Sequence, residues 1–129
     1  MFREQPQAFI ALPQGPAEPE LRTVIRETLE RHDVRPLFSD DTSLAALSNA
    51  DLVIADITGA NRNVMFEVGV ALGMGKPLLL LSQERFTDLP FDLRAHQVAV
   101  YRPGDMESVR KFMELSLRDT LRERASLKA

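Results

Sequence analysis

The segment from Asp51 to Leu81, DLVIADITGANRNVMFEVGVALGMGKPLLLL, constrains the fold more than any other part of the sequence. It begins with the apolar run LVIA and ends with the apolar run LLLL. Runs that are apolar at every position are typical of strands buried on both faces of a parallel sheet. The stretch between them is long enough for a helix, so the segment predicts a strand, a crossover helix and a second parallel strand.

The rest of the chain continues this alternation of strands and helices. A stripe of Leu21, Val24, Ile25 and Leu29 predicts an amphipathic helix near the N-terminus, and a longer stripe near the C-terminus predicts another. Between them we expect a short helix within residues 40–50 and a long loop at 83–97. The predicted strands are 8–13, 34–39, 51–58, 76–82 and 98–101, and the predicted long helices are 18–33, 61–75 and 105–125.

This order of elements predicts an α/β fold with one domain over residues 1–129. Five strands that alternate with helices favour a flavodoxin-like three-layer sandwich, with a five-stranded parallel sheet of order 2-1-3-4-5 and helices on both faces. Pro36 lacks a backbone N–H, so the second strand is expected either at an edge of the sheet or with a bulge. The final helix should cover the sheet with Val109, Phe112, Met113, Leu117 and Leu121.

Composition narrows the class of protein. The formal net charge of −3 does not suggest a nucleic-acid partner, and no stretch reaches the roughly 20 apolar residues that a membrane span needs. The sequence has no cysteine, which excludes disulfides and thiolate metal sites. It also has no phosphate loop of the Walker type. We therefore expect a cytoplasmic protein that holds neither a metal nor a cofactor.

A ligand site is expected where the strand order reverses. In an open parallel sheet of this order, ligands bind at the carboxyl ends of the first and third strands. The loops that end there are 13–20, 38–43 and 56–63. These loops and the helix that follows the last of them supply the candidate site residues. The candidate catalytic residues are Glu67, Asp41 and Asp56. The candidate substrate-binding residues are Gln14, Gly15, Asp40, Thr58, Asn61 and Asn63.

Several of these residues also have a purely structural interpretation. Asp56 and Thr58 end a strand, where such side chains often make turn hydrogen bonds. Asn61 or Asn63, and Asp40 or Asp41, fit helix caps. Glu67 is different, because it lies in an otherwise apolar helix and an unpaired buried charge is costly. Spacing alone leaves its function open.

The same residues resemble a known family. The pattern of polar and small residues resembles the motifs of nucleoside 2-deoxyribosyltransferase-like proteins and of related TIR-like predicted nucleotide-binding proteins. The residues that carry it are Asp56 and Thr58, then 61–64, then Glu67 with Gly69 and Ala71, and finally 75–77. The resemblance is dense over residues 49–83. It implies cleavage or transfer at an N-glycosidic bond between a base and a sugar. Glu67 would attack or stabilise the anomeric carbon, and a second acid, Asp41 or Asp56, would protonate the departing base.

The resemblance leaves several alternatives open. Asn61 stands where transferases of the family often carry an acid, and loop 13–20 lacks an aromatic residue that would stack on a base. The resemblance implies a nucleoside, a nucleotide or NAD as the substrate, and it leaves open whether the sugar passes to water or to another base. A nucleotide-sensing TIR-like signalling module without turnover is the alternative function. A receiver-type or flavin-binding domain fits poorly, because the loop after the first strand lacks the residues that either would need.

Three further expectations concern helix 61–75. Gly69 should allow close packing of the helix against a strand or ligand, and Gly75–Lys76 should form the helix end. Family members commonly complete their pockets with a neighbouring subunit. We therefore expect a homodimer or a dimer of dimers, with contacts along this helix through Met65 and Leu72, and with segment 86–94 as a possible addition.

Overall fold

The structure is a computed structural model that describes residues 5–15, 18–42, 44–83, 93, 96 and 98–128, without the side chains of Asp41 and of residues 124–128. It contains a five-stranded parallel sheet of order β2-β1-β3-β4-β5. This is the predicted flavodoxin-like α/β architecture. The strands are β1 (Gln7–Ala11), β2 (Arg35–Phe38), β3 (Leu52–Asp56), β4 (Leu78–Ser82) and β5 (Val98–Val100).

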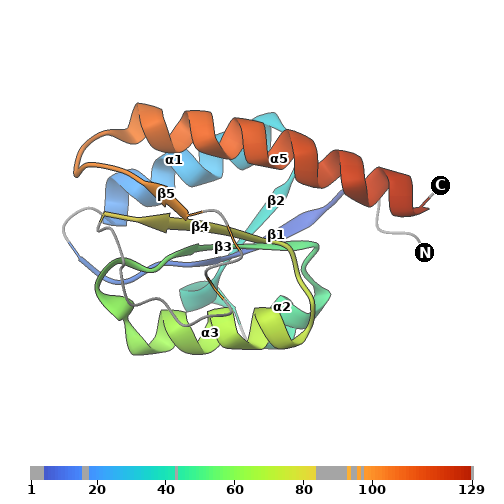
Figure 1. Ribbon diagram of the computed structural model, residues 1–129, viewed down its shortest axis with the longest axis horizontal. Coiled ribbons are helices and arrows are strands. Elements are labelled where there is room, and N and C mark those ends of the chain that lie inside the picture. The colour runs from blue at the N-terminus through green and yellow to red at the C-terminus, as the bar shows by residue number, and fades with distance from the viewer. Residues whose placement is uncertain are drawn as a thin grey trace.

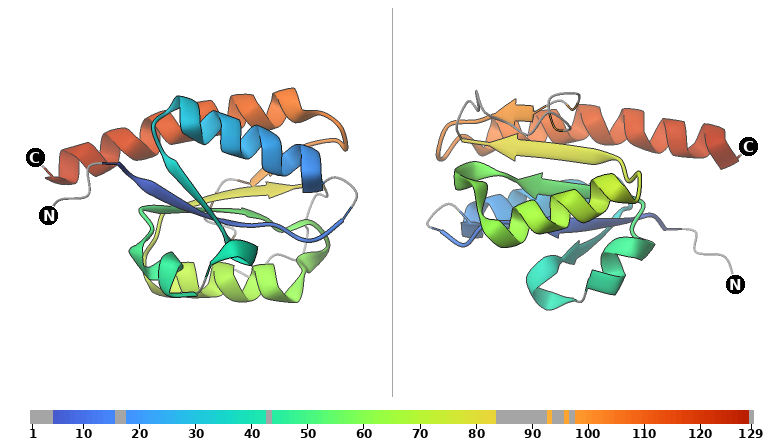
Figure 2. Two further views of the ribbon diagram at one scale, coloured as in Figure 1. Left: turned by 180° about the vertical axis from the view of Figure 1, so that it is seen from behind. Right: turned by 60° about the horizontal axis from the view of Figure 1, so that its bottom comes forward.

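Two helical layers cover the sheet. Helices α1 (Glu18–Arg31) and α5 (Met106–Lys128) lie on one face, and α2 (Leu44–Asn49) and α3 (Arg62–Gly73) lie on the other (Figure 1; Figure 2 gives two further views). Two single turns, η1 (Ser39–Asp41) and η2 (Thr58–Ala60), follow β2 and β3. Both turns lie at the carboxyl edge of the sheet, where the site was expected. Most of the predicted loop 83–97 lies outside the described residues.

The apolar residues identified from the sequence form two hydrophobic clusters, one on each face of the sheet. Every residue of β3 is buried, as expected for a central strand covered on both sides. The α1 stripe buries Leu21, Ile25 and Leu29, and the α5 stripe buries Val109, Met113 and Leu117 against the same face. Strand β2 pairs only with β1, which confirms the edge position predicted from Pro36. In the part of the chain that the structure describes, no helix is long and apolar enough to cross a membrane.

Helix α3 is fixed at both ends by its own sequence. The side-chain oxygen of Asn61 accepts hydrogen bonds from the backbone N–H groups of Asn63 and Val64, at 3.0 and 3.2 Å. At the other end Gly75 has φ +69°, and the N–H groups of Gly75 and Lys76 donate to Leu72 and Ala71. This is the Schellman arrangement that a glycine after the helix favours. The predictions of an Asn cap and of a helix end at Gly75–Lys76 are confirmed.

Two smaller expectations for residues near the site were wrong. Gly69 is exposed, and a Cβ there would meet no atom within 4 Å, so close packing against a strand does not explain this glycine. Asp40 does not cap a helix, because it lies within η1 and α2 begins only at Leu44. Its carboxylate pairs with Arg22 instead.

Candidate functional site

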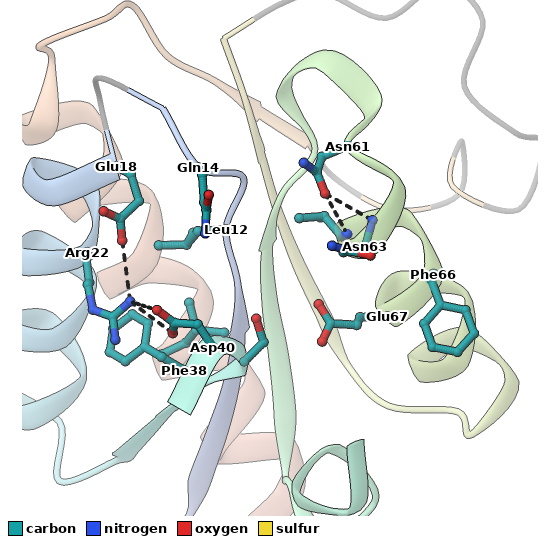
Figure 3. A pocket seen from close by; sticks show the side chains of 13 residues that line it. Leu12, Gln14, Glu18, Arg22, Phe38, Asp40, Asn61, Asn63, Phe66 and Glu67 are labelled. Carbon is teal, nitrogen blue, oxygen red and sulfur yellow. Dashed lines mark hydrogen bonds and ion pairs between the residues drawn. The ribbon is translucent and has the colours of Figure 1, made fainter. Parts of the chain in front are cut away.

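A cavity of about 410 Å³ opens at the carboxyl edge of the sheet, between α1 and η1 on one side and α3 on the other (Figure 3). Ile10 of β1 and Leu12, which follows the strand, contribute to the lining. The order of strands places this cavity beside β1 and β3, where the chain reverses direction across the sheet. The lining residues are Ile10, Leu12, Gln14, Glu18, Arg22, Phe38, Ser39, Asp40, Asn61, Asn63, Val64, Phe66 and Glu67.

Glu67 supplies the carboxylate of the α3 wall. Val64, Val68 and Ala71 bury the sheet-facing side of the helix, so Glu67 is held at the boundary between core and cavity. Its carboxylate points into the cavity, whereas the neighbouring Phe66 side chain points away from it (Figure 3). Partial burial raises the pKa of Glu67 above its usual value of 4.5, because desolvation penalises the charged form. No group among the described residues donates a hydrogen bond to this carboxylate.

The opposite wall carries a charge cluster on α1 and η1. The Arg22 guanidinium contacts both carboxylate oxygens of Asp40, at 3.1 and 3.0 Å, and also Glu18 at 3.4 Å. It lies over the ring of Phe38, 4.0 Å from the ring centroid. These contacts hold the Arg22 side chain in one orientation at the rim, and Figure 3 shows the cluster across the cavity from Glu67.

A second hollow, also of about 410 Å³, adjoins the first because Gln14 and Glu18 line both. It reaches across the ends of β3, β4 and β5. Its other lining residues are Pro13, Gly15, Leu21, Asp56, Thr58, Gln83 and Pro103. Gly15, Asp56 and Thr58 therefore lie beside the Glu67 cavity and not within it.

Asp56 is the centre of a buried hydrogen-bond network. It is only 2% exposed, and one carboxylate oxygen accepts hydrogen bonds from the Thr58 N–H at 2.9 Å and from the Thr58 hydroxyl. The Tyr101 hydroxyl donates to the other oxygen. Thr58 in turn accepts from the Gln83 N–H at 2.9 Å. Burial, and then the bond to Asp56, raise the pKa of Tyr101, so its hydroxyl stays protonated and remains a donor.

The structure thus brings five of the nine candidate residues to the first cavity, namely Gln14, Asp40, Asn61, Asn63 and Glu67. The side chain of Asp41 lies outside the described residues. Sequence reasoning missed Glu18, Arg22 and Tyr101. Glu18 and Arg22 were read as the polar face of an amphipathic helix, although their position in the first turns after β1 points them to the carboxyl edge. The pairing of Tyr101 with Asp56 joins residues 45 apart in the chain, and nothing local signals it.

Comparisons with known proteins agree with this geometry. The family model for nucleoside 2-deoxyribosyltransferase matches residues 37–97, a segment that contains Asp40, Asp56, Asn61 and Glu67. This match confirms the resemblance to nucleoside 2-deoxyribosyltransferase-like proteins that was inferred from the motifs. No curated protein matches by sequence.

Solved structures share the fold at low sequence identity. A CMP N-glycosidase of Clostridium botulinum aligns with a TM-score of 0.65 and 19% identity, over 84% of this chain and 98% of that one. A 2-deoxyribosyltransferase of Bacillus psychrosaccharolyticus aligns with a TM-score of 0.62 and 14% identity, over 81% and 90%. An archaeal flavodoxin gives a TM-score of 0.58 and 11% identity, over 88% and 98%. At these identities the likeness shows a shared fold.

Proposed function

We propose that the protein is an enzyme that cleaves the N-glycosidic bond of a nucleoside or nucleotide, or transfers the sugar from that bond to another base. Residues 37–97 match the nucleoside 2-deoxyribosyltransferase family model. The observation that supports this most directly is the carboxylate of Glu67. It faces a cavity at the expected edge of the sheet, it is partly desolvated, and it has no hydrogen-bond donor among the described residues. A carboxylate in this state is available to a ligand.

The chemistry follows from the charge that develops on the sugar. When the bond between C1′ and the base nitrogen breaks, its electron pair leaves with the base and C1′ becomes cationic. The Glu67 carboxylate stabilises that cation or forms an ester with it. Water or a second base then attacks C1′, which releases the carboxylate and completes hydrolysis or transfer. Burial raises the pKa of Glu67, and a carboxylate with a raised pKa is the stronger nucleophile in its ionised form.

The other residues take supporting roles in this proposal. Gln14, Asn61 and Asn63 line the cavity and offer amide groups to sugar hydroxyls and base edges. Asp41 follows Asp40 in η1 and remains the candidate proton donor to the base. Asp56, whose two oxygens are bound by Thr58 and Tyr101, is better suited to hold those side chains in position than to donate a proton. Gly15 and Thr58 extend the substrate-binding surface into the second hollow.

The test is release of free base from separate incubations with nucleosides, nucleoside monophosphates and NAD. Glu67→Gln should abolish release, because the amide keeps the shape of the side chain and removes the charge that C1′ needs. Glu30→Gln is the matched control, since Glu30 is exposed on α1 away from the cavity, and it should retain full turnover. Full turnover in Glu67→Gln would refute the assignment. Tight binding of a nucleotide without release of base would favour the nucleotide-sensing alternative.

A further inference from the structure

We propose that the cavity selects nucleosides whose base carries a positive charge, such as N-alkylated purine or pyridinium nucleosides, and that it disfavours a 5′-phosphate. This inference rests on the proposed function and specifies its substrate class. The observations that carry it are the charges of the cavity lining and the way in which the neighbouring helix N-termini are already capped.

The lining of the cavity is acidic. Glu18, Asp40 and Glu67 bring three carboxylates, and Arg22 is the one basic side chain among the described lining residues, which leaves a formal charge of −2. Arg22 is shared between Glu18 and Asp40 and lies on the wall opposite Glu67. In a concave, partly desolvated site such an imbalance attracts cations and repels anions.

The positions that usually bind phosphate are closed. Backbone N–H groups at a helix N-terminus form a ready anion site. At α3, however, the N–H groups of Asn63 and Val64 are taken by the Asn61 side chain. At α1, the Glu18 N–H donates to the Gly15 carbonyl, and the first turn carries Glu18 and Glu20. The N–H groups at the α3 start are thus already paired, and the α1 start carries two carboxylates that repel a phosphate.

A cationic base also matches the catalytic groups in the cavity. A neutral base needs a proton as it leaves, whereas a positively charged base takes the electron pair of the C1′–N bond and departs as a neutral molecule. In hydrolysis, water supplies the hydroxyl group on C1′, and its proton passes to a carboxylate and then to solvent. The carboxyl groups of the cavity therefore serve this reaction without a separate proton donor to the base.

The proposal is tested by comparing the rate of base release within two matched pairs of substrates. The first pair is 7-methylguanosine against guanosine, and the second is nicotinamide riboside against nicotinamide mononucleotide. We expect kcat/KM to favour the cationic nucleoside in the first pair and the unphosphorylated one in the second. Each preference should be at least about tenfold, the scale of one partly screened charge interaction, and should shrink as salt is raised.

Charge-neutralising variants separate selection by the cavity from the intrinsic reactivity of the substrates. Asp40→Asn and Glu18→Gln each free part of the Arg22 charge, so both should reduce the two preferences, whereas Glu30→Gln should leave them unchanged. Preferences that stay unchanged in both cavity variants would overturn the proposal, as would faster release from the 5′-monophosphate. Both results would leave the glycosidase function standing. Release of base from no substrate would instead refute the proposed function itself.

Discussion

At Glu67, the proposed function and the stability of the fold make opposite demands. Its α3 position buries part of the carboxylate, and this desolvation raises the pKa of the folded state above the unfolded value near 4.5. A folded state with the higher pKa binds the proton more tightly. Folding is therefore favoured while Glu67 is protonated, and this stability is lost as pH rises through the folded pKa.

We therefore predict that Glu67→Gln stabilises the protein at neutral and alkaline pH. The amide never ionises, so it avoids the desolvation cost that wild-type Glu67 bears above its folded pKa. Urea unfolding at a series of pH values measures the effect. The variant should be more stable than wild type at pH 8, and the difference should vanish below about pH 4, where both states of the wild type are protonated. Equal stability across the whole range would show that the carboxylate is effectively solvated.

The residue scale also shows where sequence reasoning stops. Glu67 was recognisable because a lone acid in an apolar helix breaks the pattern of its own element. The partners of Asp40 and Asp56 were not recognisable, because Arg22 and Tyr101 reach them from α1 and from the end of β5, and only the folded chain brings them together. Local pattern identifies unusual residues, whereas contacts between elements decide which of them bind ligand and which bind each other.

At the scale of elements, the two ends of α3 were predictable and its exposed face was not. Asn61 and Gly75 have backbone roles that local chemistry dictates, a cap and a left-handed C-terminal residue. Gly69 was assigned to close packing, yet it lies on the exposed side of the helix with open space around it. Which side of an apolar helix faces the sheet depends on the fold around it, and a helix apolar on all sides does not reveal this.

This contrast gives a paired prediction for the two glycines. Gly75→Ala should destabilise the protein by about 1–2 kcal/mol, because φ +69° places a Cβ against the following carbonyl. Gly69→Ala should stabilise it by up to about 1 kcal/mol, because alanine favours a helix interior and meets no neighbouring atom. Thermal and urea unfolding of both variants provide the measurement. A destabilising Gly69→Ala would contradict the open space that the structure shows around this glycine.

For the whole molecule, alternation of strands and helices was enough to predict the sheet order and both helical layers. Continuous apolar runs identified the central strands, Pro36 identified the edge, and right-handed crossovers left few other topologies. Association between chains depends on which residues are exposed. The structure therefore revises the residues expected to mediate it. Met65 and Leu72 are partly buried against the core, whereas Phe66 and Met74 are 61% and 49% exposed.

We retain the prediction of a homodimer or a dimer of dimers and place its contact on the exposed face of α3. Phe66 and Met74 lie eight residues apart and so share one side of the helix. Gly73 is exposed beside them and would let a second helix approach closely. Met74→Lys should dissociate the assembly in light scattering at micromolar concentration, because it places a charge in the contact. Leu115→Lys is the matched control, since Leu115 is 62% exposed on the opposite layer and its replacement should leave the assembly intact. A wild-type monomer at high concentration would refute the dimer, and a dimer that tolerates Met74→Lys would place the contact on another face.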